Sequence, residues 1–283
     1  MTAKTGGRDH AATPRAHGLV VIDRLRDVRR HHRVTDRTEG HQQRYRDSAI
    51  VEPAATSLTG TRVVVTAGPT YEDIDPVRYV GNRSSGRMGF ALAAEARRRG
   101  AEVTLIAGPT TLSPPPVDAT IAVRSAADMH EAVMRVASNA DVVIMAAAVA
   151  DYAPAAPAAQ KVTKTDGPLT LTLQRTKDIL SDLGSMRAGL GGDRPVLVGF
   201  AAETQDLLAR AREKRVRKKV DLIVANDVSK PDQGFDADTN AVTIIGEGDE
   251  QVVPLQSKAR VAAVILDRVE HLLRSRTGKL ASR

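Results

Sequence analysis

Short runs of β-branched residues alternate with segments of helical spacing from Thr61 onward, and this rhythm restricts the folds open to the chain. Such alternation is typical of a parallel sheet covered by helices on both faces. We expect buried strands at the following positions: Arg62–Thr66, Val103–Ala107, Asp141–Met145, Val196–Phe200 and Leu222–Ala225. Helices are expected between and after them, at Phe90–Arg99, Ala126–Ser138, Lys177–Arg187, Thr204–Lys219 and Val261–Leu273. The predicted fold class is α/β, a Rossmann-like, doubly wound and mainly parallel sheet.

The second half of the chain departs from this rhythm in three places. Residues 152–168 are rich in Ala, Pro and Lys, and we expect a mobile loop there. Leu169–Leu173 alternates apolar and polar residues, which predicts a strand. Ala241–Ile245 and Gln251–Leu255 flank a Gly-rich turn, which predicts a β-hairpin.

The composition fits this fold and excludes several classes of chemistry. Aromatic residues make up only 2%, so the core must be built from Ala, Val, Leu and Ile. The absence of cysteine excludes disulfides, thiolate metal sites and Cys nucleophiles, and nothing indicates secretion. No apolar run approaches the ~20 residues that cross a bilayer, so we expect a cytoplasmic protein with no membrane association.

The formal charge of +7 is concentrated at the N-terminus. The first 50 residues hold 11 basic and 6 acidic side chains, whereas the remainder holds 30 and 28. We therefore expect a disordered basic leader at 1–56, a nucleotide-binding domain at 57–276 and a flexible tail at 277–283. The leader is either a functional arm or dispensable, and its acids argue against a transit peptide. The near-neutral body argues against a nucleic-acid-binding protein.

A glycine-rich segment, residues 81–89, opens the first predicted helix. Ser84, Ser85 and Gly86 would present N–H and hydroxyl donors to an anion, although an ordinary capped helix start has the same composition. Gly86 and Gly89 partly match a dinucleotide fingerprint, which keeps an NAD(P)-dependent oxidoreductase as an alternative. Against it, some 14 residues separate the first strand from this segment, and no acid ends the second strand.

Three further groups of residues carry candidate chemistry. Ala146 and Ala147 follow a strand, where small side chains admit a base or ribose, and Asp151 could accept from hydroxyls or cap a turn. Lys161 lies on the expected mobile loop, where it could close over a polyphosphate or stay solvated. Lys214 and Lys218 share one helix face, either to clamp a triphosphate or to complement the helix dipole.

Several motifs in this order resemble the phosphopantothenate–cysteine ligase family, an acid–amino-acid ligase of coenzyme A biosynthesis, over about residues 60–273. The motifs are Thr66-Ala-Gly-Pro-Thr70, Asp75-Pro-Val-Arg78, Gly81-Asn82, Ser84-Ser-Gly86, Met88-Gly89, Ala148-Val-Ala-Asp-Tyr152, Lys161-Val-Thr-Lys164, Gly199-Phe-Ala-Ala-Glu-Thr204 and Ala225-Asn-Asp227. The resemblance implies that CTP activates 4′-phosphopantothenate as an acyl-cytidylate, which the amine of L-cysteine attacks. The residues themselves do not decide whether the nucleotide is CTP or ATP.

The resemblance also implies roles for individual residues. Asn82 would hold the acyl-cytidylate, Arg78 would complete turnover, and Lys161 would be the lid lysine. The cytidine and triphosphate contacts would come from Met145, Ala146, Ala147, Asp151, Phe200, Lys214, Lys218 and the segment Thr176-Lys177-Asp178-Ile179. That segment departs from the family's Asn-Pro-Asp-Ile pattern, so backbone contacts are expected there. Metal ligands stay unassigned, with Mg²⁺ carried mainly by the triphosphate.

The family's bacterial members are homodimers, and the hairpin of residues 241–255 is the expected contact. In many bacteria the domain is fused to a flavin-dependent decarboxylase, which is not recognisable here, so FMN chemistry is not transferred. A separate decarboxylase could bind this chain. A non-catalytic, nucleotide-binding subunit remains a third alternative.

Overall fold

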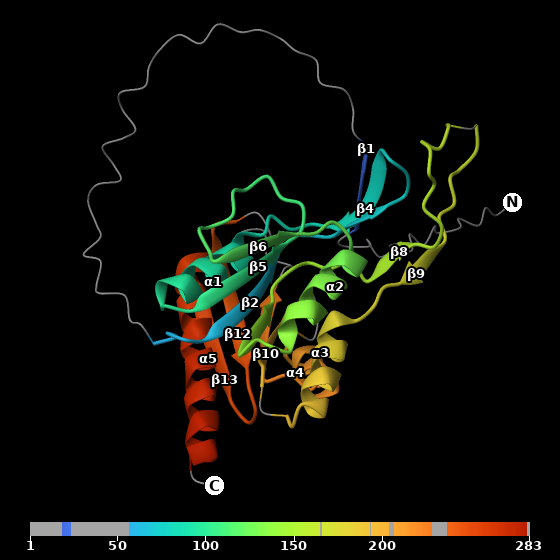
Figure 1. Cartoon of the computed structure of the whole chain (residues 1–283). Helices are drawn as coiled ribbons and strands as arrows, with labels where there is room; N and C mark the ends of the chain where they lie inside the picture. The colour runs from blue at the N-terminus through green and yellow to red at the C-terminus, as the bar shows by residue number, and fades with distance from the viewer. Residues whose placement is uncertain are drawn as a thin grey trace, which may run out of the picture.

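The protein is described from a computed structural model that covers the strand at 19–23 and residues 57–281, apart from 165, 193, 204–206 and 228–236. Its centre is an eight-stranded sheet with the strand order β13-β12-β11-β10-β7-β2-β5-β6 (Figure 1). Six neighbouring strands run parallel: β6 (Ala119–Ala122), β5 (Glu102–Ala107), β2 (Arg62–Ala67), β7 (Val142–Met145), β10 (Val196–Glu203) and β11 (Leu222–Asp227). The hairpin of β12 (Thr239–Ile245) and β13 (Glu250–Ser257) extends the sheet in antiparallel fashion.

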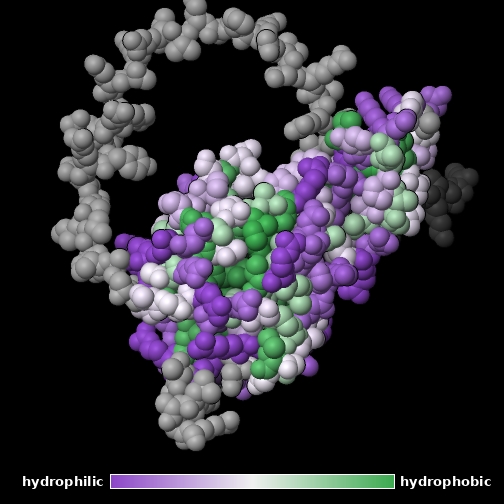
Figure 2. Space-filling view, in the orientation of Figure 1, coloured by the Kyte–Doolittle hydropathy of each residue, from purple (hydrophilic) through white to green (hydrophobic). Residues whose placement is uncertain are grey.

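The described part of the chain has five helices, which cover the sheet in two layers. The helices α1 (Arg87–Arg98) and α5 (Lys258–Ala281) pack on one face, and α2 (Ala126–Ala137), α3 (Ile179–Gly189) and α4 (Leu207–Lys218) pack on the other. Side chains alternate between the faces, since Val63 and Val65 join the α1–α5 core whereas Val64 joins the other core. The face seen in Figure 2 has hydrophobic side chains near its centre with hydrophilic ones around them. The prediction of a doubly wound, mainly parallel α/β sheet with a terminal hairpin is confirmed.

Two small antiparallel units lie outside the main sheet, and the second begins inside the loop expected at residues 152–168. In the first unit, between β2 and α1, β3 (Tyr71–Asp73) pairs with β4 (Arg78–Asn82), and the rings of Tyr71 and Tyr79 stack with centroids 3.8 Å apart. The second unit pairs β8 (Tyr152–Pro154) with β9 (Leu173–Arg175). Both units lie to one side of the main sheet in Figure 1. The strand predicted at 169–173 is wrong, since β9 begins only at Leu173. Leu169, at the start of the predicted strand, is 54% exposed and does not pack against an apolar surface.

The chain ends also differ from expectation. Within the expected leader, the run Leu19–Asp23 forms β1, which pairs antiparallel with β4, while the other residues of 1–56 lie outside the described chain. At the C-terminus, α5 continues through residue 276 to Ala281, beyond both the predicted helix end at Leu273 and the expected tail boundary.

The strand order places a switch point between β2 and β7. From β2 the chain passes to β5 and β6 on one side, and then crosses to β7 and β10 on the other. Loops that leave two such strands diverge to opposite faces, which opens a crevice at their carboxyl ends. The structure therefore has a candidate ligand site where Thr66, Ala67 and Met145 end their strands.

A buried ion cluster joins α1 to α5. The Arg99 side chain is 7% exposed and donates to Glu95 (2.7 Å), Asp267 (2.7 Å) and Glu270 (2.7 Å), and to the carbonyl of Ala263 (2.9 Å). Burial alone would lower the pKa of Arg99, but its hydrogen bonds to the three carboxylates raise it above the usual value. The guanidinium thus stays charged and links the two helices of this layer.

Replacing Arg99 with Met is expected to lower the free energy of unfolding by about 3–5 kcal/mol, because Glu270 and Glu95 would be left without their buried counter-ion. Urea denaturation at neutral pH measures this loss. Arg98→Met is the matched control, since Arg98 pairs with Glu95 from a position that is 51% exposed, and should cost less than about 1 kcal/mol. Equal losses in the two variants would contradict the role assigned to Arg99.

Candidate functional site

The loops after β2 and β7 are joined by hydrogen bonds through two buried threonines. The Thr66 hydroxyl accepts from the Ala147 N–H (3.1 Å), and the Thr70 hydroxyl accepts from the Ala150 N–H (3.0 Å). Between them, the N–H of Ala148 donates to the carbonyl of Gly68 (2.9 Å). Residues 146–150 are therefore held by their backbone, and their small side chains leave the space above the strand ends open.

A cleft of about 700 Å³ lies at this edge of the sheet, on the α3–α4 face. Ten of the predicted nucleotide-binding residues line it: Met145, Ala147, Asp151, Thr176, Lys177, Asp178, Ile179, Phe200, Lys214 and Lys218. The structure thus brings together side chains that are up to 73 positions apart in the sequence, from Met145 to Lys218. Ala146 does not line the cleft and packs toward the core of the α1–α5 face.

Basic side chains form one wall of the cleft. The Lys214 ammonium donates to the Phe200 carbonyl (2.8 Å), and the Lys218 ammonium pairs with Asp178. Partial burial lowers the pKa of Lys218, the nearby charge of Arg175 lowers it further, and Asp151 opposes both effects. The wall therefore has a cation whose charged form an added anion would stabilise.

The predicted site residues leave out two of these cations, Arg175 and Arg217, and the lining residue Leu180, whereas Val149, Ala150 and Tyr152 stood in a family motif without an assigned role. Arg217 carried a usable signal, because it lies three residues after Lys214 and so near the same helix face. Arg175 carried none, because its strand was predicted in the wrong place.

The segment before α3 is fixed against the β7 loop. The Thr176 hydroxyl donates to the Ala150 carbonyl (2.7 Å), and the Thr176 N–H donates to the Asp151 carbonyl (3.0 Å). Asp178 caps α3 by accepting from the Ser181 N–H (3.0 Å). Because α3 begins at Ile179, its positive end lies at the cleft, where it favours negative charge.

The three residues predicted to be catalytic lie beside the cleft rather than in its lining. Asn82, at the end of β4, donates through its amide to the Val149 carbonyl (2.9 Å). Arg78 donates to the Val162 carbonyl (2.8 Å), next to the exposed Lys161. The structure thus connects Asn82 to the β7 loop and Arg78 to the lysine loop, and their catalytic roles stay predictions.

Asp75 organises this lysine loop. Its buried carboxylate accepts from Arg78 (2.5 Å), from the N–H groups of Val77 and Arg78 (both 2.8 Å) and from the Val162 N–H (3.1 Å). The hydrogen bond from the Arg78 side chain is the main reason that the pKa of Asp75 lies well below its usual range.

The glycine-rich segment forms the start of α1. Gly86 is the N-cap residue with φ 80°, in the left-handed region, and no side chain caps the helix, so the alternative of a Ser cap is wrong. A Cβ at Gly86 would lie 3.2 Å from the N atom of Gly68, so glycine also permits close packing on the β2 loop. Ser84 accepts from the Gly86 N–H (3.3 Å), and Ser85 lies between them; neither they nor Gly86 line the cleft.

Two further findings concern the described part of the chain only. No helix among the described residues has the length and apolar character needed to span a bilayer. No cluster of three or more His, Asp or Glu side chains that could hold a metal ion occurs in it, and Asp151 and Asp178 are the carboxylates of the cleft.

Comparison with known proteins gives a family. A model described as the DNA/pantothenate metabolism flavoprotein C-terminal domain matches residues 58–273. The chain belongs to this family. The coenzyme A biosynthesis bifunctional protein CoaBC of Bacillus subtilis (strain 168) is 48% identical over 225 residues, which are 79% of this chain and 54% of that protein. The chain thus spans about half the length of such curated relatives of the family.

Solved structures of the family have the same fold. The crystal structure of the C-terminal domain of a coenzyme A biosynthesis bifunctional protein CoaBC has a TM-score of 0.65 and 41% identity, and the match covers 78% of this chain and 99% of that one. A Cab2 mutant in complex with phosphopantothenate-cysteine has a TM-score of 0.62 at 16% identity, covering 76% and 88%, and shows the fold alone. The family resemblance read from the motifs is confirmed.

Replacing Asp75 with Ala is expected to reduce hydrogen-exchange protection at the amides of Val77, Arg78 and Val162, because all three donate to this carboxylate. The pKa of Asp75 is lower in the folded than in the unfolded protein, so its carboxylate stabilises the loop fully above the ordinary aspartate pKa of about 4. This stabilisation is lost only at lower pH, as the folded-state pKa is crossed.

Hydrogen exchange followed by NMR or mass spectrometry checks both parts. Asp73→Ala is the control, because Asp73 pairs with Arg124 at an exposed position. The assignment fails if Val162 is equally protected in wild type and the Asp75 variant, or if its protection disappears near pH 4.

Proposed function

We propose that the protein ligates 4′-phosphopantothenate to L-cysteine with CTP as the activating nucleotide, giving 4′-phosphopantothenoylcysteine, CMP and pyrophosphate. The observation that carries the proposal is the cleft at the carboxyl ends of β7 and β10, where a floor of small residues meets a cationic wall and the start of α3. Family membership over residues 58–273 supports it.

The lining of the cleft suits a nucleotide. Ala147 and Ala150 leave room for a flat base or ribose, and the Asp151 carboxylate and the Thr176 hydroxyl oxygen offer acceptors to its hydroxyl and amino groups. Lys177, Lys214, Arg217 and Lys218 lie on the α3–α4 side, where a triphosphate would meet several cations. Mg²⁺ would be carried mainly by that triphosphate, since the cleft offers only two carboxylates.

The chemistry follows from the weak electrophilicity of a carboxylate. The substrate carboxylate attacks the α-phosphorus of CTP, pyrophosphate leaves, and the acyl-cytidylate then has a good leaving group in CMP. The cysteine amine attacks the acyl carbon and loses a proton as CMP departs. In this proposal Asn82, whose amide contacts the β7 loop, would donate to the acyl group, and Lys161 would approach the developing charge when its loop closes.

The choice of CTP rests on backbone groups of the β7 loop. Thr66 and Thr70 hold the β7 loop in one conformation, so the remaining N–H and carbonyl groups of that loop present a constant pattern to the edge of a base. A fixed hydrogen-bonding pattern discriminates bases more strongly than apolar contact with Phe200 alone.

Pyrophosphate release by the purified protein with Mg²⁺, 4′-phosphopantothenate and L-cysteine tests the proposal, with CTP and ATP in parallel reactions. Release with CTP that requires 4′-phosphopantothenate is expected. Release with ATP but not with CTP would support the ligation reaction and contradict the choice of CTP. Absence of release with either nucleotide from folded protein would contradict the proposed reaction itself.

In the same assay Lys161→Gln and Asn82→Asp are expected to fold normally and to lose overall ligation by about 10²-fold or more, since each removes a donor that the proposed mechanism assigns to the developing charge. Lys164→Gln is the matched control, because Lys164 is an exposed lysine of the same loop. Unchanged turnover in Lys161→Gln or Asn82→Asp would show that the role of that residue is wrongly assigned.

We also propose that two copies associate through β13. This strand is the edge of the main sheet, so one row of its backbone groups has no neighbouring strand in the sheet, and it exposes Val252 (75%) and Leu255 (50%). An exposed apolar edge strand is a surface that another chain can cover.

Substituting Lys for both Val252 and Leu255 is expected to convert a dimer into a monomer, because two charges would be buried in the interface. Light scattering after size-exclusion chromatography measures the molar mass. Val216→Lys is the control, since Val216 is similarly exposed (67%) but lies on α4 rather than on the edge strand. A monomeric wild-type protein, or a dimer that persists in the double variant, would rule out this interface.

A further inference from the structure

Glu72, in the middle of β3, is a buried acid that neither lines the nucleotide cleft nor takes part in the proposed chemistry. It is only 5% exposed. Burial raises the pKa of Glu72, and hydrogen bonds from Thr70 and Ala126 oppose this effect. The nearby carboxylates of Asp128 and Asp73 raise the pKa further. A buried acid is disfavoured unless it is hydrogen-bonded, so the partners of Glu72 indicate its role.

Two donors from separate parts of the chain meet this carboxylate. The N–H of Ala126, the first residue of α2, donates to Glu72 (2.9 Å). The second donor is the hydroxyl of Thr70. An ionised carboxylate only accepts hydrogen bonds, so the hydroxyl proton of Thr70 points toward Glu72. The Thr70 oxygen is then left to accept from the Ala150 N–H (3.0 Å).

This chain of hydrogen bonds continues into the candidate site. Ala150 lines the nucleotide cleft, and its carbonyl accepts from the Thr176 hydroxyl (2.7 Å). The carbonyl of the preceding residue, Val149, accepts from the Asn82 amide (2.9 Å). The direction of the Thr70 hydroxyl therefore bears on the floor of the cleft and on the acceptor that holds Asn82.

Hydrogen bonds rather than an ion pair hold Glu72 in place. In the part of the chain that the structure describes, no cation pairs with it, and the Arg124 guanidinium pairs instead with the neighbouring Asp73 (2.6 Å). The residue opposite Glu72 on β4 is Val80, which has no polar side chain. The carboxylate thus depends on Thr70 and Ala126 for its stabilisation.

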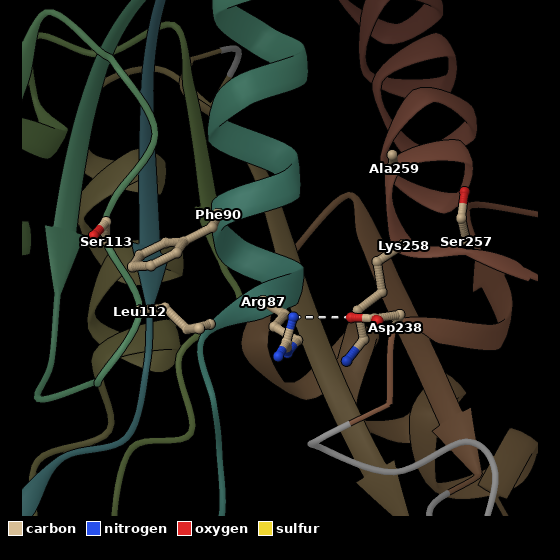
Figure 3. A pocket seen from close by; sticks show the side chains of 8 residues that line it. All are labelled: Arg87, Phe90, Leu112, Ser113, Asp238, Ser257, Lys258 and Ala259. Atoms are coloured by element: carbon tan, nitrogen blue, oxygen red, sulfur yellow. Dashed lines mark hydrogen bonds and ion pairs between the residues drawn. The ribbon is translucent and has the colours of Figure 1, made fainter. Parts of the chain in front are cut away.

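Glu72 also distinguishes the start of α2 from other helix starts at the carboxyl edge. Between the starts of α1 and α5 lies a second cavity, of about 390 Å³, where Arg87 and Lys258 reach toward the same space with Asp238 between them (Figure 3). At the start of α2, which follows β6, the protein's own carboxylate meets the first N–H and the positive end of the helix. This arrangement favours a positioning role for Glu72 over ligand binding.

We propose that Glu72 is a positioning residue of the ligase site: its carboxylate orients the Thr70 hydroxyl, which in turn fixes Ala150 at the floor of the nucleotide cleft. The assignment rests on the proposed function. It gives Glu72 an effect on nucleotide binding without contact with the nucleotide.

Glu72→Gln tests the orientation, because an amide has one accepting and one donating end. The Ala126 N–H is fixed by the helix, so the Gln carbonyl is expected to remain on it and the amide N–H₂ to face Thr70. The Thr70 proton then loses its acceptor, and its oxygen receives a donor that competes with Ala150. The variant is expected to fold, since it keeps the shape of the side chain and removes a buried charge.

Hydrogen exchange of the full chain without nucleotide measures the consequence. Protection at the Ala150 amide is expected to fall in Glu72→Gln, whereas protection at the Ala147 amide, which the Thr66 hydroxyl accepts (3.1 Å), stays as in wild type. A general loss of stability would lower both. Glu131→Gln is the control, because Glu131 is an acid of α2 that is exposed.

Two variants of Thr70 keep the proposal testable if Glu72→Gln does not fold. Thr70→Val is expected to lower protection at Ala150 selectively, and Thr70→Ser, which keeps the hydroxyl, to restore it. Adding Glu72→Gln to Thr70→Val should lower protection at Ala150 no further, since both changes act on the same hydrogen bond.

Steady-state ligation connects this hydrogen bond to function. In Glu72→Gln the KM for CTP is expected to rise by about 5- to 10-fold, the effect of one lost hydrogen bond, while kcat changes less. An unchanged KM, unchanged protection at Ala150, or equal losses at Ala147 and Ala150 would each contradict the positioning role and leave the reaction itself untouched. Selective loss at Ala150 from a protein whose wild type releases no pyrophosphate would support the orientation of Thr70 by Glu72 and contradict the ligase.

Discussion

The hydrogen bonds that join the β2 loop to the β7 loop determine the shape of the backbone on which the candidate nucleotide cleft is built. Thr66 and Thr70 are fully buried, and the hydroxyl oxygen of each accepts a hydrogen bond from a backbone N–H of the β7 loop. A β-branched residue suits the strand and its turn, and its hydroxyl satisfies an N–H that would otherwise be buried without a partner. The loop after β7 therefore keeps its shape without large side chains of its own, and a cleft can form above it.

Close backbone packing extends this constraint to α1. A Cβ on Gly108 would lie 1.8 Å from the carbonyl oxygen of Pro69, and one on Gly89 would lie 2.5 Å from the Cβ of Ala67. Neither distance is possible for a real side chain, so glycine is required at both positions for the β5 loop and α1 to contact the end of β2. The positive end of α1 is thereby fixed at the carboxyl edge, beside the segment that carries Asn82.

The sequence predicts the elements whose stability comes from burial and misses those whose stability comes from pairing at the periphery. The strands β2, β5 and β7 read as apolar runs because both faces of the sheet are covered. β6 has only half-buried and exposed residues, so it gave no apolar signal, and β3 gave none because it is three residues long and two of them are acidic. Leu169–Leu173 has the right alternation, but its residues are exposed or only half-buried, and the strand forms at Leu173–Arg175 instead.

The same distinction applies to the site. Residues that follow a core strand or share a helix face, such as Asp151 and Lys214, could be placed at one edge from the pattern alone. The cavity between α1 and α5 could not, because it depends on how the β12–β13 hairpin brings Lys258 next to Arg87, 171 positions earlier. Pairings over such separations are set by topology, and local spacing carries no information on them.

Two lysines of the nucleotide cleft already have acceptors within the protein, and these internal contacts influence which ligands can bind. Lys218 pairs with Asp178, and Lys214 donates to the carbonyl of Phe200. A ligand that recruits these ammonium groups must first replace those acceptors, so a weakly charged ligand gains little from the exchange. A polyphosphate offers several acceptors of greater charge and can recruit both lysines together with Arg217. The internal pairs thus give Lys214 and Lys218 acceptors within the protein, and they bias the cleft toward multiply charged anions over neutral or singly charged ones.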